Sequence, residues 1–212
     1  MNGWHGGLCA VVLWPASALA GPVDYGSIDG FVAPLASIEA AWPETLRRVD
    51  DSGFGFGFGA RVLSRVTDTL VVTAEFDHGG YDALDTNLYR LGAGFAGPST
   101  SGVFLTYDHR SLDVDTAKGF ALHGRVAGTV LEPAGMIERV GLYGDLAYGG
   151  WDADNFYFDG FEFTLGTTLD LAKPWGLFAD YRRLMLDDRD YSTHDQLRLQ
   201  EFRLGVRFRF DC

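Results

Sequence analysis

The chain has 212 residues and a formal net charge of -12, with 28 glycines and 14% aromatic residues. No apolar run approaches the roughly 18 to 20 residues of a transmembrane helix, so a membrane-spanning form of this chain has to be a closed β-barrel. The acidic excess argues against nucleic-acid binding, which requires a basic surface.

Residues 1–20 have the organisation of a cleaved signal peptide. An apolar core from Leu8 to Trp14 precedes a small-residue cleavage site at Ala18–Ala20. No Lys or Arg precedes the core, so a buried first helix stays open as the alternative. The mature chain is then expected to span 21–212.

The stretch "GFGFGFGA" at 53–60 alternates glycine with Phe54, Phe56 and Phe58. It contains the G-x-G-x-x-A pattern of dinucleotide-binding loops, starting at Gly55. That pattern needs an apolar strand before it and an amphipathic helix after it, and the flanking sequence has neither. The strict period of two predicts a β-strand instead, with the phenylalanines on one face.

Similar alternating runs recur along the rest of the chain, separated by breaks. They are 53–63, 69–77, 88–96, 102–110, 119–131, 138–149, 157–171, 175–184 and 198–210. A further strand is expected at 27–42, although Pro34 interrupts it. Bacterial single-chain barrels have even strand numbers. The pattern therefore predicts an all-β, transmembrane, antiparallel up-and-down barrel of about ten strands, with eight as the alternative.

The breaks differ in length and composition. Short ones such as "EPAG" alternate with longer acidic ones such as "DHGGYDALDTN" and "SLDVDTAKG". Outer-membrane barrels have short turns at one end and long loops at the other. We therefore expect long acidic loops at one end of the barrel.

Sorting each run by parity gives an apolar face and a charged face. The apolar face is expected to contact lipid through Phe54, Phe56, Phe58, Phe161, Phe163, Trp175, Phe208 and Phe210. Aromatic girdles are expected near the strand ends, at Tyr81, Tyr107, Tyr148, Trp151, Trp175 and Tyr181. A soluble lipocalin-type barrel, with the apolar face inside, is the alternative.

The charged face is expected to line the lumen as a network of ion pairs. Its members are Arg61, Glu75, Arg90, Asp108, His123, Arg125, Asp145, Asp180, Arg182, Glu201, Arg203 and Arg207. Counting across the last hairpin places Arg182 opposite Glu201, and Asp180 opposite Arg203. We expect Gly55→Ser to be mild because it adds only a hydroxyl to a polar lumen.

From "IDGF" at 28–31 to "RFRF" at 207–210 the chain resembles the small outer-membrane β-barrel proteins of Gram-negative bacteria. These include the OmpA-type transmembrane domain, OmpX-like proteins and uncharacterised porin-like relatives. The segments "YRLGAGFAG", "VGLYGDLAYGG", "GLFADYRRLMLDD" and "LRLQEFRLGVRFRF" carry the resemblance. Such barrels usually end on an aromatic residue, whereas here Asp211 and Cys212 follow Phe210.

The resemblance implies a location in the bacterial outer membrane and a monomeric barrel. The implied contacts are with outer-membrane lipid and lipopolysaccharide. The resemblance also implies contacts with periplasmic chaperones and the barrel-assembly machinery during biogenesis. No nucleic-acid partner and no cofactor are expected.

Catalytic and metal sites have weaker support. His123, expected beside Asp145 and near Asp108, has the surroundings of a general base, but the sequence places no nucleophile beside it. His109-Arg110-Ser111 matches only a fragment of the lipid A deacylase pattern. The acidic pairs at 113–115, 152–154 and 188–190 lack the ordered calcium loop. We therefore expect no catalytic residue and no metal site.

The sequence thus favours a non-enzymatic outer-membrane barrel with a charged, largely closed lumen. Such a barrel would have a structural role or interact through its acidic loops. A narrow porin-like channel, a lipid-modifying barrel enzyme and a secreted lipocalin-like lipid binder remain as alternatives.

Overall fold

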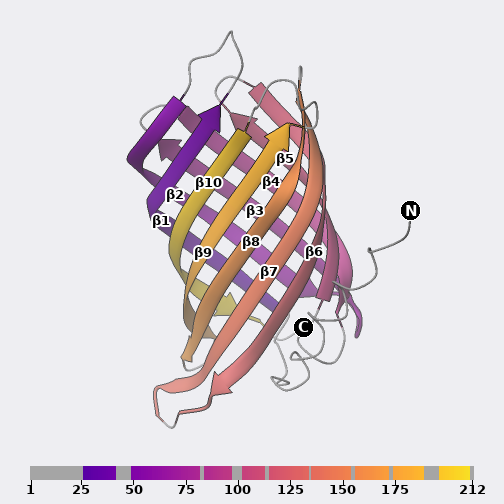
Figure 1. Cartoon of the computed structure of the whole chain (residues 1–212). Helices are drawn as coiled ribbons and strands as arrows, with labels where there is room; N and C mark the ends of the chain where they lie inside the picture. The colour runs from indigo at the N-terminus through magenta and orange to yellow at the C-terminus, as the bar shows by residue number, and fades with distance from the viewer. Residues whose placement is uncertain are drawn as a thin grey trace, which may run out of the picture.

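The computed structural model shows a closed barrel of antiparallel strands (Figure 1). It describes residues 26–41, 49–81, 84–96, 102–112, 115–133, 135–153, 156–171, 174–188 and 196–210, so the expected signal peptide lies outside the described residues. The strands are β1 Gly26–Ala41, β2 Val49–Arg65, β3 Leu70–Tyr81, β4 Leu84–Ala96, β5 Gly102–Leu112, β6 Asp115–Leu131, β7 Ile137–Ala153, β8 Phe156–Leu171, β9 Trp175–Asp188 and β10 Gln196–Arg209.

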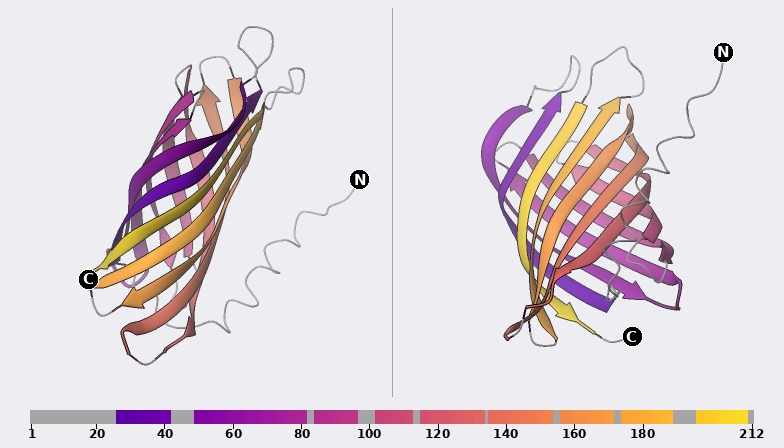
Figure 2. Two further views of the ribbon diagram at one scale, coloured as in Figure 1. Left: turned by 90° about the vertical axis from the view of Figure 1, so that its left-hand side faces the viewer. Right: turned by 60° about the horizontal axis from the view of Figure 1, so that its bottom comes forward.

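Each strand pairs with its neighbours in the sequence, and β1 closes the barrel by pairing with β10. The prediction of an all-β, up-and-down barrel with ten strands is therefore confirmed, and the eight-stranded alternative is wrong. The strands are tilted against the barrel axis in both views of Figure 2, as closure of a sheet requires.

The strand expected at 27–42 is β1, and Pro34 falls where its pairing is irregular. The register with β10 shifts between Val32 and Leu35, and the register with β2 shifts between Ala33 and Ala36. Proline has no backbone N–H to donate to a ladder, so it is tolerated at such an irregularity.

The described residues include no helix long and apolar enough to cross a membrane.

The connections between strands lie at two ends of the barrel, a loop end and a turn end. At the loop end, β1 leads to β2, β3 to β4, β5 to β6, β7 to β8 and β9 to β10. At the turn end, the other connections lie together with the start of β1 and the end of β10 (Figure 1).

The predicted contrast between long and short connections is wrong for most of the barrel. β3 ends at Tyr81 and β4 begins at Leu84, while β5 ends at Leu112 and β6 begins at Asp115. The acidic segments read as loops are therefore largely strand. Of their acids, Asp85 is an exposed strand residue near the loop end, whereas Asp77 points into the lumen.

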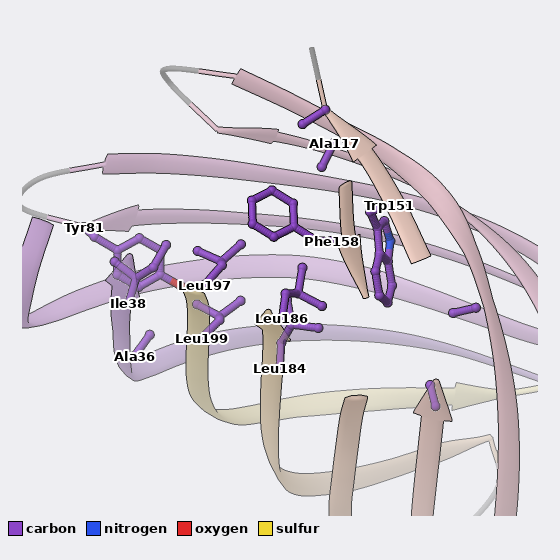
Figure 3. Packing of buried hydrophobic residues seen from close by; sticks show 13 residues of the cluster. Ala36, Ile38, Tyr81, Ala117, Trp151, Phe158, Leu184, Leu186, Leu197 and Leu199 are labelled. Atoms are coloured by element: carbon purple, nitrogen blue, oxygen red, sulfur yellow. The ribbon is translucent and has the colours of Figure 1, made fainter. Parts of the chain in front are cut away.

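Apolar side chains fill the loop end of the barrel interior. Figure 3 shows Trp151, Phe158, Leu184, Leu186, Leu197 and Leu199 converging with Ile38 and Tyr81 inside the barrel. Trp151 is 1% exposed and Tyr81 is 7% exposed, so their assignment to an external aromatic girdle is wrong. Both share the parity of the inward residues on their strands, and parity decides the face whatever the residue type.

Candidate functional site

The outer surface of the strands is apolar around the middle of the barrel. Phe56 is 56% exposed, and Phe58, Phe161, Trp175 and Phe208 are also exposed. Phe163 and Phe210 are half-buried on the same surface. The side chain of Phe54 lies outside the described residues.

The exposed charged residues of the described strands lie close to strand ends. Toward the loop end they are Glu39, Asp85, Lys118, Asp152 and Asp187, and at the turn end Glu138. Between them a continuous apolar band surrounds the barrel. An exposed apolar surface larger than a few hundred Å² marks contact with a membrane or a partner. The middle of the barrel therefore has the opposite arrangement to a lipocalin-type barrel.

The charged face lies inside, and its central member is Arg90 on β4. Its Nε and Nη2 donate to both carboxylate oxygens of Asp108 at 2.8 and 2.6 Å. Its Nη1 and Nη2 also donate to Glu162 on β8, at 2.9 Å each. Glu75 on β3 lies 3.4 Å from Nη1. Because Arg90 reaches from β4 to β8, this cluster crosses the lumen.

Arg182 on β9 extends the cluster toward the loop end. Its guanidinium lies 2.8 Å from Glu162, 3.2 Å from Asp77, 3.4 Å from Glu75 and 3.7 Å from Glu201. The predicted pairing opposite Glu201 is present in the register. The shorter contacts, however, are made with acids on other strands.

The second predicted pair is close. Arg203 stands opposite Asp180 in the register, and its Nε donates to that carboxylate at 2.6 Å. Arg203 also lies 2.9 Å from Glu75, and the hydroxyl of Tyr143 donates to Asp180. Arg203 and Asp180 are each 1% exposed, so the pair is desolvated and depends on mutual neutralisation.

Asp29 on β1 holds two arginines nearer the turn end. Arg207 donates to it at 2.7 and 2.8 Å, and Arg61 at 2.9 Å. Arg125 stands opposite Asp145 in the register. Within the described residues, however, no carboxylate pairs with Arg125 and its Nε has no hydrogen-bond partner.

His123 is held by two hydrogen bonds in the same part of the lumen. Its Nδ1 lies 2.9 Å from the carboxylate of Asp145, and its Nε2 lies 3.1 Å from the hydroxyl of Thr106. Thr106 in turn donates to Asp108 at 3.0 Å. Both expected acids are therefore connected to His123, one directly and one through Thr106.

The structure places a hydroxyl, that of Thr106, beside His123. In a nucleophile, base and acid triad the hydroxyl donates its proton to the imidazole, whereas the Thr106 hydroxyl donates to Asp108. The Thr106 side chain is 1% exposed and borders a cavity of about 40 Å³. That volume accommodates a few water molecules at most. The arrangement therefore satisfies buried polar groups of the lumen.

Several buried residues of the lumen are not members of the predicted network. Asp29, Asp77 and Tyr143 are buried and make polar contacts inside the barrel. Their strand parity already placed them inward. Their distant partners across the lumen depend on the barrel cross-section, which hairpin counting does not supply.

The expectation for Gly55 is also wrong. A Cβ at that position would lie 2.3 Å from the ring of Tyr81. Gly55→Ser therefore forces a buried ring to move. The signal that could have shown this is the inward parity of Tyr81.

The remaining motif residues are not assembled into a site. His109 packs outward beside Tyr89, whereas Arg110 is buried inside. Of the acidic pairs, Asp113, Asp154 and Asp190 lie outside the described residues. No group of three or more His, Cys, Asp or Glu side chains suited to a metal ion occurs among the residues that the structure describes.

Comparison with known proteins gives similarity in structure only. No family model matches the chain, and no curated protein matches it. Among solved structures, an outer-membrane channel from Pseudomonas putida F1 is similar with a TM-score of 0.40 and 12% identity, over 89% of this chain and 98% of the channel. The translocator domain of autotransporter NalP from Neisseria meningitidis has a TM-score of 0.37 and 12% identity, over 97% and 96%.

Proposed function

We propose that the protein is a monomeric β-barrel of a Gram-negative outer membrane, with a closed lumen and no enzymatic activity. The observation that supports this is the apolar band of the exterior, bounded at both ends by exposed charges. The inward ion pairs keep the charged side chains away from the hydrocarbon region, where each would be costly.

Two layers of side chains that lie across the lumen support a closed barrel. The apolar cluster around Trp151 and Phe158 fills the loop end. The ion pairs of Arg90, Arg182 and Arg203 cross the middle. The described hollows beside them are only about 40 and 50 Å³. A barrel of this strand number has little space beyond its own side chains, so a narrow channel has less support than a closed barrel.

The loop end is the surface through which the barrel would interact. Exposed acids at Glu39, Asp85, Asp152 and Asp187 surround it. In an outer membrane this rim would lie among lipopolysaccharide phosphates, and divalent cations would bridge the two sets of negative charge. A structural or surface-contact role in the envelope follows from this arrangement.

Cell fractionation followed by gel electrophoresis without boiling tests the proposal. We expect the protein in the outer-membrane fraction, with a folded band that migrates differently from the boiled band. Recovery in the soluble periplasm, with identical migration in both samples, would contradict the membrane assignment.

A further inference from the structure

A hollow of about 50 Å³ lies inside the barrel near the turn end, beyond the central ion pairs. Basic and hydroxyl side chains from four strands border it: Arg125, Arg139, Arg207, Arg209, Thr129 and Thr168. Asp170 also borders the hollow and contacts Arg139 at 2.6 Å and Arg209 at 3.4 Å. The one carboxylate in its wall is therefore already neutralised.

Most arginines in this region pair with a carboxylate, and among the described residues Arg125 is the exception. Arg207 pairs with Asp29, which Arg61 shares while also lying 3.7 Å from Asp180, and Arg209 lies 3.4 Å from Glu138. Arg125 is 9% exposed, makes no ion pair among the described residues, and leaves its Nε without an acceptor. Its Cζ lies 4.7 Å from the ring centroid of Tyr143, and Asp145, which stands opposite Arg125 in the register, pairs instead with His123.

A buried guanidinium without a counter-charge is strongly unfavourable. The forked N–H groups of arginine match the geometry of phosphate and carboxylate oxygens, and threonine hydroxyls donate to the same oxygens. We propose that this hollow binds a small oxyanion of the phosphate class, with Arg125 as its main counter-charge. The volume fits one inorganic oxyanion and excludes a nucleotide or a sugar phosphate.

This site goes beyond the proposed function and does not depend on it. Oxyanion binding is a property of the lumen, whereas membrane insertion is a property of the exterior. A barrel that inserts normally but ignores phosphate would contradict only the site.

The test uses the folded barrel in non-ionic detergent, in a phosphate-free zwitterionic buffer, with inorganic phosphate titrated in a calorimeter. We expect saturable binding to the unaltered protein and at least about tenfold weaker binding to Arg125→Gln. Arg198→Gln is the matched control, because Arg198 lies near the loop end and, among the residues that the structure describes, donates to Gln196 alone. Its phosphate binding should equal that of the unaltered protein.

Thermal unfolding provides a second readout. Without phosphate, Arg125→Gln should unfold at the same temperature as the unaltered protein or higher, because it removes an uncompensated charge. Added phosphate should raise the unfolding temperature of the unaltered protein and leave that of Arg125→Gln unchanged. Saturation by chloride at the same concentrations, or a non-saturating phosphate effect that is equal in all three proteins, would overturn the proposal. If Arg125→Gln does not fold, the phosphate and chloride titrations of the unaltered protein still decide it.

Discussion

Arg182→Ala is expected to destabilise the barrel by about 3–5 kcal/mol, the range for removing one partner of a buried ion pair. Arg182 is 1% exposed and contacts Glu162, Asp77, Glu75 and Glu201. Without the positive charge of Arg182, these buried carboxylates would repel one another more strongly. Urea unfolding in liposomes, followed by tryptophan fluorescence, measures the change in the free energy of unfolding.

Double-mutant cycles separate the contributions of the Arg182 partners. Coupling to Glu162 at 2.8 Å should exceed coupling to Glu201 at 3.7 Å, although Glu201 is the partner found by counting across the hairpin. Simple additivity with both acids would show that these contacts do not form. Arg198→Ala, at the loop end, is the matched control and should change stability by at most about 0.5 kcal/mol.

Phe56→Arg is expected to cost about 2–4 kcal/mol, because it places a charge on the lipid face near the middle of β2. Phe56 is 56% exposed and lies within the apolar band. The same liposome unfolding assay measures this loss.

Val66→Arg is the matched control for Phe56→Arg. Val66 is 58% exposed and follows β2 at the turn end, where the polar interface would lie. Introducing an arginine at this position should therefore cost only about 0–1 kcal/mol. Equal losses at the two positions would contradict the placement of the membrane.

The sequence was sufficient to predict the strand number and the orientation of the side chains. Alternation in "GFGFGFGA" placed Phe56 and Phe58 on one face, and both are exposed in the structure. Alternation in the last two strands placed Arg182 and Arg203 on the inward face, and counting across their hairpin gave the correct partners in the register. Period-two alternation is enough for this, because every residue on a strand takes one of two faces.

Contacts across the lumen were not predictable from the same pattern. Arg90 reaches Glu162, and Arg203 reaches Glu75, between strands that are not neighbours. Such distances depend on barrel diameter and strand stagger, which are properties of the closed sheet. The contact between the Thr106 hydroxyl and His123 was not predictable for another reason. Threonine is common in strands and carries no distinctive signal.

Predictions that rested on residue type and not on strand position were wrong for the acidic segments and for Trp151. Acidic segments were interpreted as long loops, although β4 begins at Leu84 and β6 at Asp115. Trp151 was interpreted as an external anchor because aromatic residues favour membrane interfaces. It packs inside with Leu184 and Leu186.

Planar-bilayer recording on the purified monomer at neutral pH tests most directly whether the lumen is closed. The apolar cluster at the loop end and the ion pairs of Arg90, Arg182 and Arg203 predict no steady conductance above the background of the bilayer. Large, steady, single-step conductance from a monomer would contradict the closed lumen and identify the barrel as a pore.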